Sequence, residues 1–208
     1  MDILLIGATG MIGKEIASEA TRRGHRVTPV SRSGGEGIET ADATDTTRIT
    51  TLASGHDAVV MATNPPHDVT DGTTPFLAAG TSVIEATRAA GVRRLVFVGG
   101  AGSLLLPDGE RVIDAAWFPA EFKAVAQAHV ELLELIRRDA TDLEWTYISP
   151  PPMIQPGERT GTYTSGHDDV VADADGVSTI SVEDYAIALV DELEQNTNVG
   201  KRMTVAYA

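Results

Sequence analysis

Three glycines occupy seven positions of the segment GATGMIG, directly after the apolar run DILLI near the start of the chain. In a strand-to-helix turn of this kind, Gly7 permits a sharp exit from the strand. Gly10 removes the side chain where a pyrophosphate would press on the backbone, and Gly13 lets the helix pack closely. The helix N-terminus then offers unpaired N–H groups and a positive dipole end to phosphates. The pattern predicts a dinucleotide site; the alternative is a tight turn without a ligand. The candidate site also takes in the residues between these glycines, Thr9, Met11 and Ile12.

Apolar and amphipathic segments alternate along the 208 residues. Several of the short apolar runs are continuous, as expected of parallel strands that are buried on both faces. This alternation predicts an α/β protein with a doubly wound parallel sheet, the Rossmann fold, over residues 1–208 as a single domain. The expected strands are 3–6, 27–30, 58–61, 95–98, 143–148 and 203–207, and the expected helices are 11–23, 46–53, 75–90, 121–138 and 182–194.

Two stretches interrupt the alternation, residues 99–119 and residues 150–180. Both are too long for ordinary connections, and departures of this length from a compact scaffold are commonly lids or walls of a substrate site. We expect both on the substrate side, the second as a small C-terminal elaboration in which residues 160–180 form a hairpin. Ser181 and Asp184 are spaced close to a capping box for the helix that follows.

Thirty acidic side chains against 16 basic ones give the chain a formal net charge of −14. This balance argues against binding to nucleic acid or to an anionic membrane, because both need clustered Lys and Arg. An anion site must therefore be local.

The absence of cysteine excludes disulfides, thiolate metal ligands and cysteine nucleophiles. There is no room for a signal peptide before the first strand and no apolar stretch long enough to span a membrane, so a cytoplasmic protein is expected.

The end of the second expected strand indicates which dinucleotide is preferred. NAD-binding domains usually carry an acidic residue there for the ribose 2′-hydroxyl, but this chain has Ser31, Arg32 and Ser33. The guanidinium of Arg32 suits a 2′-phosphate, and the serines can donate to it. NADP(H) is therefore expected in preference to NAD(H). The alternative is a solvated loop arginine, since 13 of the 16 cations are Arg.

Longer segments match a known family. GATGMIG, VFVGGAGSL, FPAEFKAVAQAHVELLELIR, LEWTYISPPPMIQPGERTGTY and ISVEDYAIALVDELE together resemble the atypical short-chain dehydrogenase/reductase group over nearly the whole chain. Within that group the chain is similar to the NAD(P)H-binding proteins described as NADH-flavin reductases, and more distantly to biliverdin reductase B and the NmrA-like regulators. The resemblance implies a cofactor path along the carboxyl ends of the strands. Its adenosine and diphosphate half would follow Gly7–Gly13, Arg32, Asp42, Ala43, Ala62 and Thr63, and its nicotinamide half would approach Gly99, Gly100, Lys123, Ser149, Pro150 and Pro151.

The catalytic pair of typical short-chain dehydrogenases, Tyr-x-x-x-Lys, is incomplete. Four positions before Lys123 stands Pro119, so the tyrosine that would act as acid and base is missing. Carbonyl reduction needs a proton donor at the developing alkoxide, which argues against an alcohol or sugar dehydrogenase and against an epimerase. Lys123 is either a ligand of the nicotinamide ribose or an ordinary surface lysine. By rough alignment Ser103 stands at the active-site serine of biliverdin reductase B, although the histidine that follows the proline pair there is Met153 here.

A flat conjugated acceptor makes a lighter chemical demand, because a flavin ring accepts hydride directly and can take its proton from water. The leading interpretation is therefore an NADPH-dependent oxidoreductase, monomeric or homodimeric, that reduces a small-molecule acceptor such as a flavin or quinone. Trp117 and Phe118 could stack on such a ring, or they could pack within the fold or make a subunit contact. If a proton donor is needed, Ser103 and Tyr147 are the candidates. The rival interpretation is a non-catalytic NADP(H)-binding sensor of the NmrA-like type, which the missing tyrosine also fits.

Other polar residues are expected to have structural roles. No metal site is expected, because the histidines lack metal-ligand spacing and favour surface or capping positions. The segment DADG at 173–176 has too few ligands for a calcium loop. Asp42 could meet the adenine amine or be a turn or cap residue, whereas Asp45 is expected to cap the next helix. The five histidines are His25, His56, His67, His129 and His167.

Overall fold

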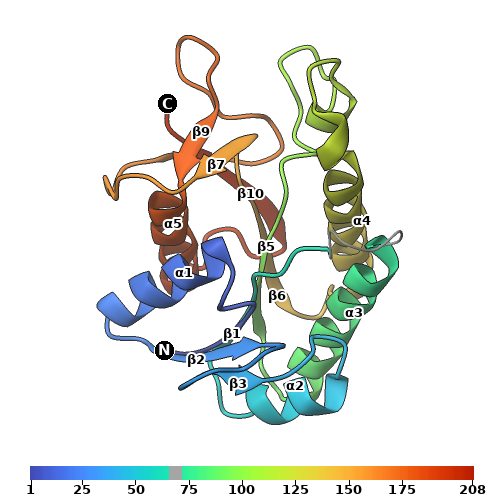
Figure 1. Ribbon diagram of the computed structural model, residues 1–208, viewed down its shortest axis with the longest axis vertical. Helices are drawn as coiled ribbons and strands as arrows, with labels where there is room; N and C mark the ends of the chain where they lie inside the picture. Colours follow the sequence, from blue (N-terminus) through green and yellow to red (C-terminus); the bar gives the residue numbers. More distant parts are fainter. Residues whose placement is uncertain (66–71) are drawn as a thin grey trace.

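The computed structural model describes residues 1–65 and 72–208. Its centre is an eight-stranded sheet with the order β3-β2-β1-β4-β5-β6-β10-β8, and helices cover both faces of this sheet (Figure 1). Neighbouring strands pair in parallel, except that β8 runs antiparallel to β10. This is the doubly wound Rossmann fold that the sequence predicts, with the winding direction reversing between β1 and β4.

Each strand and helix expected from the sequence is present, with small shifts of its ends. The strands of the main sheet are β1 Asp2–Ile6, β2 Arg26–Ser31, β3 Glu39–Thr40, β4 Ala58–Met61, β5 Arg94–Val98, β6 Glu144–Ser149, β8 Thr164–Gly166 and β10 Lys201–Ala206. A separate two-stranded sheet pairs β7 Met153–Gln155 with β9 Thr179–Ser181. The helices are α1 Met11–Arg22, α2 Thr46–Ala53, α3 Thr73–Ala89, α4 Lys123–Asp139 and α5 Val182–Gln195, with short 3-10 turns at Val112–Asp114 and Ala120–Phe122. None of the helices in the described part of the chain has the length and apolarity that crossing a bilayer requires.

Alternate residues of the central strands face opposite layers of the fold. Leu4 and Ile6 of β1 pack with α2, α3 and α4 on one face of the sheet, whereas Ile3 and Leu5 pack with α1 and α5 on the other. All four side chains are buried, which explains why β1 is a continuous apolar run rather than an alternating one. Because both faces are covered, a ligand site has to be built from the loops at the strand ends.

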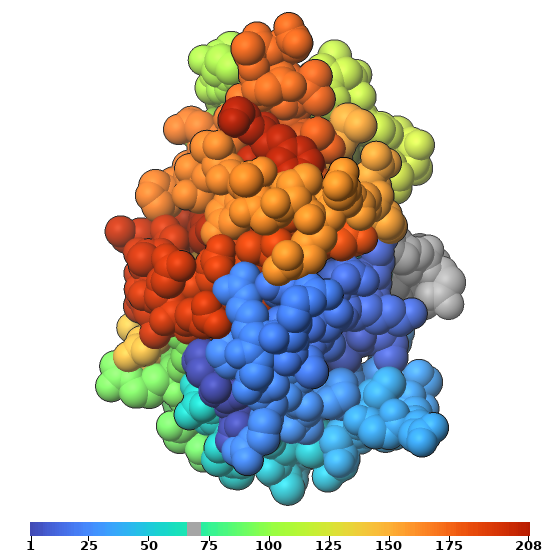
Figure 2. All heavy atoms as spheres, turned by 90° about the vertical axis from the view of Figure 1, so that its left-hand side faces the viewer, coloured from blue at the N-terminus to red at the C-terminus, as the bar shows by residue number. Residues whose placement is uncertain are grey.

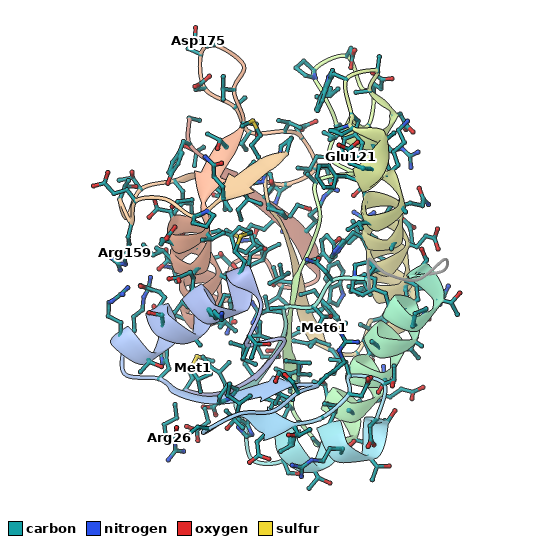
Figure 3. The ribbon with its side chains drawn as sticks, viewed as in Figure 1. Met1, Arg26, Met61, Glu121, Arg159 and Asp175 are labelled. Carbon is teal, nitrogen blue, oxygen red and sulfur yellow. The ribbon has the colours of Figure 1, made fainter. Side chains whose placement is uncertain are left out.

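The stretch 160–180 does not form the expected hairpin. β8 pairs with the edge of the main sheet at β10, and β9 pairs in parallel with β7. A tight turn does occur in the segment DADG, where the Asp173 carboxylate accepts hydrogen bonds from the amides of Asp175 and Val177. The turn chemistry is therefore as expected, but the strands on either side find partners elsewhere. In Figure 3, Asp175 marks the tip of this turn and Glu121 lies across from it, just before α4.

Two carboxylates fasten the 150–180 stretch to the helices beneath it. Glu19 of α1 accepts two hydrogen bonds from Arg159, at 2.9 and 3.0 Å. Together with a hydrogen bond from Arg23, they lower the pKa of Glu19 from 4.5 to about 2. Asp184 of α5 accepts a hydrogen bond from Thr160. The capping box is thus only half formed, since the Ser181 hydroxyl caps α5 without a return bond from Asp184. Figure 2 shows the stretch, in orange, lying directly over α1, in blue.

Arg94 and Arg93 offer a matched pair of substitutions at the start of β5. Arg94 bonds the carboxylate of Glu192 at 2.8 Å, and the two side chains are only 4% and 1% exposed. Arg94→Met leaves that carboxylate buried without its cation, so the free energy of unfolding should fall by about 3–5 kcal/mol. Arg93 pairs with Glu144 at the surface, so Arg93→Met should cost less than about 1 kcal/mol. Urea unfolding of both variants measures the difference, and equal losses would contradict it.

Candidate functional site

The glycine turn between β1 and α1 is held against the two strands that flank β1. Gly7 has a φ of +90°, which side chains of L-residues rarely allow. Its amide donates to the carbonyl of Val30 at 2.9 Å. A Cβ at Gly7 would lie 2.3 Å from the carbonyl oxygen of Ala62. Gly7 is therefore required both by its backbone angle and by the close approach of the chain after β4.

Gly10 and Gly13 serve different purposes. A Cβ at Gly13 would lie 2.2 Å from the carbonyl oxygen of Gly7, so glycine at this position lets α1 rest directly on the turn. Gly10 is the N-cap of α1, and a Cβ there would meet only the Gly7 carbonyl, at 3.4 Å. No described side chain caps this helix end, so the first N–H groups of α1 are left for an outside acceptor. The space over Gly10 suits a phosphate.

A cleft of about 620 Å³ lies at the carboxyl ends of β1, β2 and β4, beside the start of α3. This is the point where the winding of the sheet reverses, and it is where open α/β sheets bind their ligands. Nine of the predicted cofactor residues line the cleft, namely Gly7, Thr9, Gly10, Ser31, Arg32, Asp42, Ala43, Ala62 and Thr63. The rest of its wall was not predicted and consists of Ile6, Ala41, Thr44, Asn64, Pro65, Pro75, Phe76 and Ala79.

Arg32 differs from the other arginines of the chain. Of the 13, it alone has no ion pair with a described residue. Its side chain is exposed and lines the cleft. The pKa of the nearby Asp42 carboxyl is lowered by hydrogen bonds from the amide and hydroxyl of Thr44 and, to a smaller extent, by the charge of Arg32. In a chain with an excess of carboxylates, an arginine left without one at a cleft is a candidate to bind an anion.

Asp42 and Asp45 take the places expected of turn and cap residues. The Asp42 carboxylate accepts both bonds from Thr44 on a single oxygen, Oδ1, which forms the turn, and the residue still lines the cleft. Asp45 caps α2 by accepting from the amide of Arg48 at 2.9 Å. The capping prediction is confirmed, and a contact between Asp42 and adenine stays a prediction.

The remaining predicted cofactor residues do not line this cleft. The first turn of α1 holds Met11, Ile12 and Gly13, and just past β2 lies Ser33. The loop after β5 begins with Gly99 and Gly100, and α4 begins with Lys123. The end of β6 and the residues after it are Ser149, Pro150 and Pro151. Packing accounts for two of these glycines. A Cβ at Gly99 would lie 2.2 Å from the ring of Tyr147, and a Cβ at Gly100 would lie 2.8 Å from the Cβ of His129.

The two predicted catalytic residues have different surroundings. Lys123 is the first residue of α4 and is exposed. Ser103 accepts a 2.7 Å hydrogen bond from the guanidinium of Arg202 on β10, a buried side chain that also contacts Asp168. Neither residue lines the cleft. The bond to Arg202 gives Ser103 a structural role, and its part in catalysis stays a prediction.

Tyr147 is not placed to donate a proton to a ligand. Its side chain is fully buried, and its hydroxyl donates to the carbonyl of His129 at 2.9 Å while it accepts from the amide of Gly100 at 3.0 Å. Burial raises the pKa of the phenol well above its ordinary value. The hydroxyl is thus committed to the fold, and the suggestion that Tyr147 is a proton donor is wrong.

A protein family model described as NAD(P)H-binding matches residues 7–195. The chain belongs to this NAD(P)H-binding family. Three solved structures of similar proteins share its fold over almost their full lengths. A "putative exported protein" of Burkholderia pseudomallei is 42% identical, with a TM-score of 0.90 and 100% of each chain covered. A "putative epimerase" of Bacteroides thetaiotaomicron is 35% identical, with a TM-score of 0.89 and coverage of 99% of this chain and 96% of the other. A "putative NADH-flavin reductase" of Streptococcus pneumoniae is 33% identical, with a TM-score of 0.84 and 100% of each chain covered.

These comparisons confirm the resemblance to atypical short-chain dehydrogenases/reductases and the oxidoreductase-like fold. The names of the three similar proteins point to different activities, so membership of the NAD(P)H-binding family fixes the cofactor class and not the acceptor. One of them is called exported, and a cytoplasmic location of this chain stays a prediction.

Sequence reasoning missed one contact at the cleft, between Asn64 and His129. Asn64 follows β4 and lines the cleft, and its Oδ1 lies 3.0 Å from Nε2 of His129 on α4. The expectation of a surface or capping role is wrong for His129, which is only 3% exposed. Burial lowers the pKa of its imidazole from 6.5 to about 4, so the ring is neutral at pH 7. Asn64 could have been recognised as a site residue, because it is a polar residue that comes soon after a buried strand. The burial of His129 could not be recognised, because it depends on which elements pack against α4.

The described residues hold no group of three or more His, Asp or Glu that could bind a metal ion. His67 lies outside the described residues.

The neutral His129 should make the protein less stable in mild acid. Because its pKa is lowered from 6.5 to about 4, the unfolded chain takes up a proton as the pH falls below 6.5 and the folded protein does not. Between pH 7 and pH 5 this should reduce the free energy of unfolding by about 2 kcal/mol. Because glutamine does not titrate, the free energy of unfolding of His129→Gln should fall by about 2 kcal/mol less over the same pH range. Urea unfolding of both proteins at the two pH values tests the assignment, which an equal pH dependence would rule out.

Proposed function

We propose that this member of the NAD(P)H-binding family is an NADPH-dependent reductase that passes hydride to a flat conjugated acceptor such as a flavin or quinone. The observation that carries the proposal is that one cleft combines the uncapped N-terminus of α1 over Gly10 with Arg32, which lacks an ion pair among the described residues. A diphosphate suits the helix end, and a ribose 2′-phosphate suits the guanidinium fork.

The residues present fit such a cofactor. Gly10 has no Cβ where the diphosphate would lie, and a Cβ built there would meet only the carbonyl oxygen of Gly7, at 3.4 Å. When bound, NADPH would supply the hydride. The chain would hold the diphosphate on the amides of α1 and the 2′-phosphate on Arg32. The nicotinamide half would extend toward Gly99 and Ser149, at the carboxyl ends of β5 and β6.

The choice of acceptor rests on three positions among the described residues, each of which could have held a proton donor near that end and holds none that is free to act as one. The position of the usual tyrosine is Pro119, Tyr147 is buried and Ser103 is bonded to Arg202. A flavin or quinone gains hydride from the cofactor and a proton from solvent, so it requires alignment more than a side-chain acid. Trp117 is 58% exposed and lies next to Phe118, with their ring centroids 6.4 Å apart. An aromatic pair of this kind can stack on a flat ring.

A second candidate is a non-catalytic NADP(H) sensor. It would use the same cleft, and the missing tyrosine fits it equally well. The exposed rings of Trp117 and Phe122 favour the sensor, because large exposed apolar side chains can mark a surface that binds a protein partner. The two candidates differ in turnover, because a sensor binds the cofactor without oxidising it.

Gly10→Leu tests whether the cleft binds a dinucleotide. A leucine side chain would fill the space over the helix end, so NADPH binding measured by fluorescence titration should be lost, while circular dichroism stays unchanged. Gly10→Ala is the control for the fold, because its Cβ meets only the Gly7 carbonyl at ordinary contact distance. Wild-type affinity in a folded Gly10→Leu protein would exclude this site.

Arg32→Ala tests the preference for NADP(H). A charge-assisted contact contributes roughly 1.5–3 kcal/mol, which corresponds to about 10- to 150-fold in affinity. The substitution should remove a preference of this size and leave NAD(H) affinity nearly unchanged. Arg48→Ala is a matched control, since Arg48 is paired with Glu39 and does not line the cleft. Equal binding of both cofactors by the unaltered protein would contradict the assignment.

The proposed activity is tested by NADPH oxidation with a panel of flavins, quinones, aldehydes and ketones. Flavins or quinones should be reduced best, and the rate at saturating NADPH should show no pH limb from a tyrosine-like acid. Lys123→Ala should raise the KM for NADPH more than it lowers kcat, because a contact with the ribose stabilises the bound cofactor equally in the ground state and in the transition state. Binding without turnover of any acceptor would favour the sensor. Efficient reduction of a simple ketone would overturn the acceptor class.

A further inference from the structure

His129 is a buried side chain that joins several elements around the cleft. From α4, its Nε2 reaches Oδ1 of Asn64, and its ring packs edge-on against Phe76 with centroids 4.9 Å apart. Both of these partners line the cleft. The backbone carbonyl of His129 accepts from the hydroxyl of Tyr147 on β6, and that hydroxyl accepts from the amide of Gly100. His129 itself is not part of the cleft wall, so any effect on a ligand passes through Asn64 or Phe76.

The backbone around His129 leaves it little freedom. A Cβ at Gly100 would come within 2.8 Å of the Cβ of His129, so the helix lies directly on the loop after β5. The bond from Tyr147 fixes the same residue of α4 from the sheet side. The imidazole is therefore aimed from a rigid base, which a side chain needs if it is to orient another.

The hydrogen bond to Asn64 assigns the proton on the imidazole. The ring is neutral at pH 7, and its partner atom is an oxygen, so Nε2 must carry the hydrogen. Nδ1 is buried without a partner among the described residues. A charged ring would put a second N–H at that position with no acceptor, which is costly in a buried site. The neutral tautomer with Nε2–H is thus the one that fits the surroundings.

Asn64 is exposed at the cleft, in contrast to His129. Its Oδ1 is engaged by the imidazole, so the two hydrogens of its amide group are left to donate elsewhere. Without the imidazole, the amide could rotate and present either its oxygen or its nitrogen to a ligand. The bond therefore decides which of the two is offered. Phosphate and ribose oxygens accept hydrogen bonds, so the donor end is the useful one for a dinucleotide.

We propose that His129 is a positioning residue for the cleft: it holds the Asn64 side chain so that the amide NH₂ group donates to an oxygen of the bound dinucleotide. This inference rests on the proposed binding of NADP(H). It adds Asn64 to the residues that contact the cofactor and gives the buried imidazole a part in binding that does not involve proton transfer. The competing explanation is that His129 only fills space against Phe76.

Two substitutions at His129 separate these explanations. His129→Phe keeps a ring against Phe76 and removes the donor, whereas His129→Gln keeps an N–H donor at about the same reach and loses the ring. Loss of one neutral hydrogen bond corresponds to roughly 2- to 12-fold in affinity. We expect His129→Phe and Asn64→Ala each to weaken NADPH binding by about this factor in fluorescence titrations, and His129→Gln to restore most of it.

The double variant Asn64→Ala/His129→Phe gives the decisive readout. If His129 acts through Asn64, the double variant should bind NADPH as weakly as Asn64→Ala alone, because the second change has nothing left to position. A full additional loss, or unchanged affinity in His129→Phe, would overturn the inference. In the protein without cofactor, ¹⁵N NMR of the imidazole should show Nε2–H and a bare Nδ1 at pH 7; the opposite tautomer would also overturn it. Absence of NADPH binding by the unaltered protein would instead remove the proposed function, and this inference with it.

Discussion

Contact of backbone on backbone at the glycine turn determines where the candidate site lies. With no Cβ at Gly13, α1 rests on the carbonyl of Gly7, and with no Cβ at Gly7 the turn rests on the chain after β4. Contacts of this kind cannot relax as side chains do, because protein interiors are close-packed. Farther along this edge of the sheet, glycine backbone instead packs against side chains, with Gly99 against the ring of Tyr147 and Gly100 against the side chain of His129. The position of α1 relative to the ends of β1 and β4 is therefore fixed by backbone contacts.

The cleft can attract an anion, although the net charge of the chain is negative. The chain carries a net charge of −14, which repels extended polyanions. Its carboxylates pair with every arginine except Arg32 among the described residues, and several of these pairs, such as Arg159 with Glu19, serve to fasten one part of the fold to another. A small anion therefore meets two favourable groups in the cleft, the start of α1 and Arg32, within a surface that is otherwise unfavourable to it.

The fold and about half of the candidate site follow from local sequence patterns. Buried parallel strands, amphipathic helices and the spacing of Gly7, Gly10 and Gly13 each have a local physical cause, and local causes can be recognised in a sequence. Pairing partners cannot be recognised in this way, which is why the turn at Asp173 is present but the expected hairpin is not.

The residues around Tyr147 and His129 show a second limit. Glycine is required both where a ligand approaches and where a side chain packs, since both need the missing Cβ. The sequence GG at Gly99 and Gly100 is therefore compatible with either cause, and the structure supplies the packing one. Likewise, a histidine on an amphipathic helix reveals nothing of whether another element covers it. His129 is buried because the loop after β5 and the start of α3 close over it.

The edges of the main sheet have a consequence for self-association. β3 has two residues and β8 has three, and these short strands form the two edges in the described part of the chain. An edge strand recruits another sheet through its row of free N–H and C=O groups, and a short edge offers few of them. Joining of two sheets through β3 or β8 is therefore disfavoured. A contact between copies that is made by side chains of helices or loops would instead depend on surface residues that can change without disturbing the sheet.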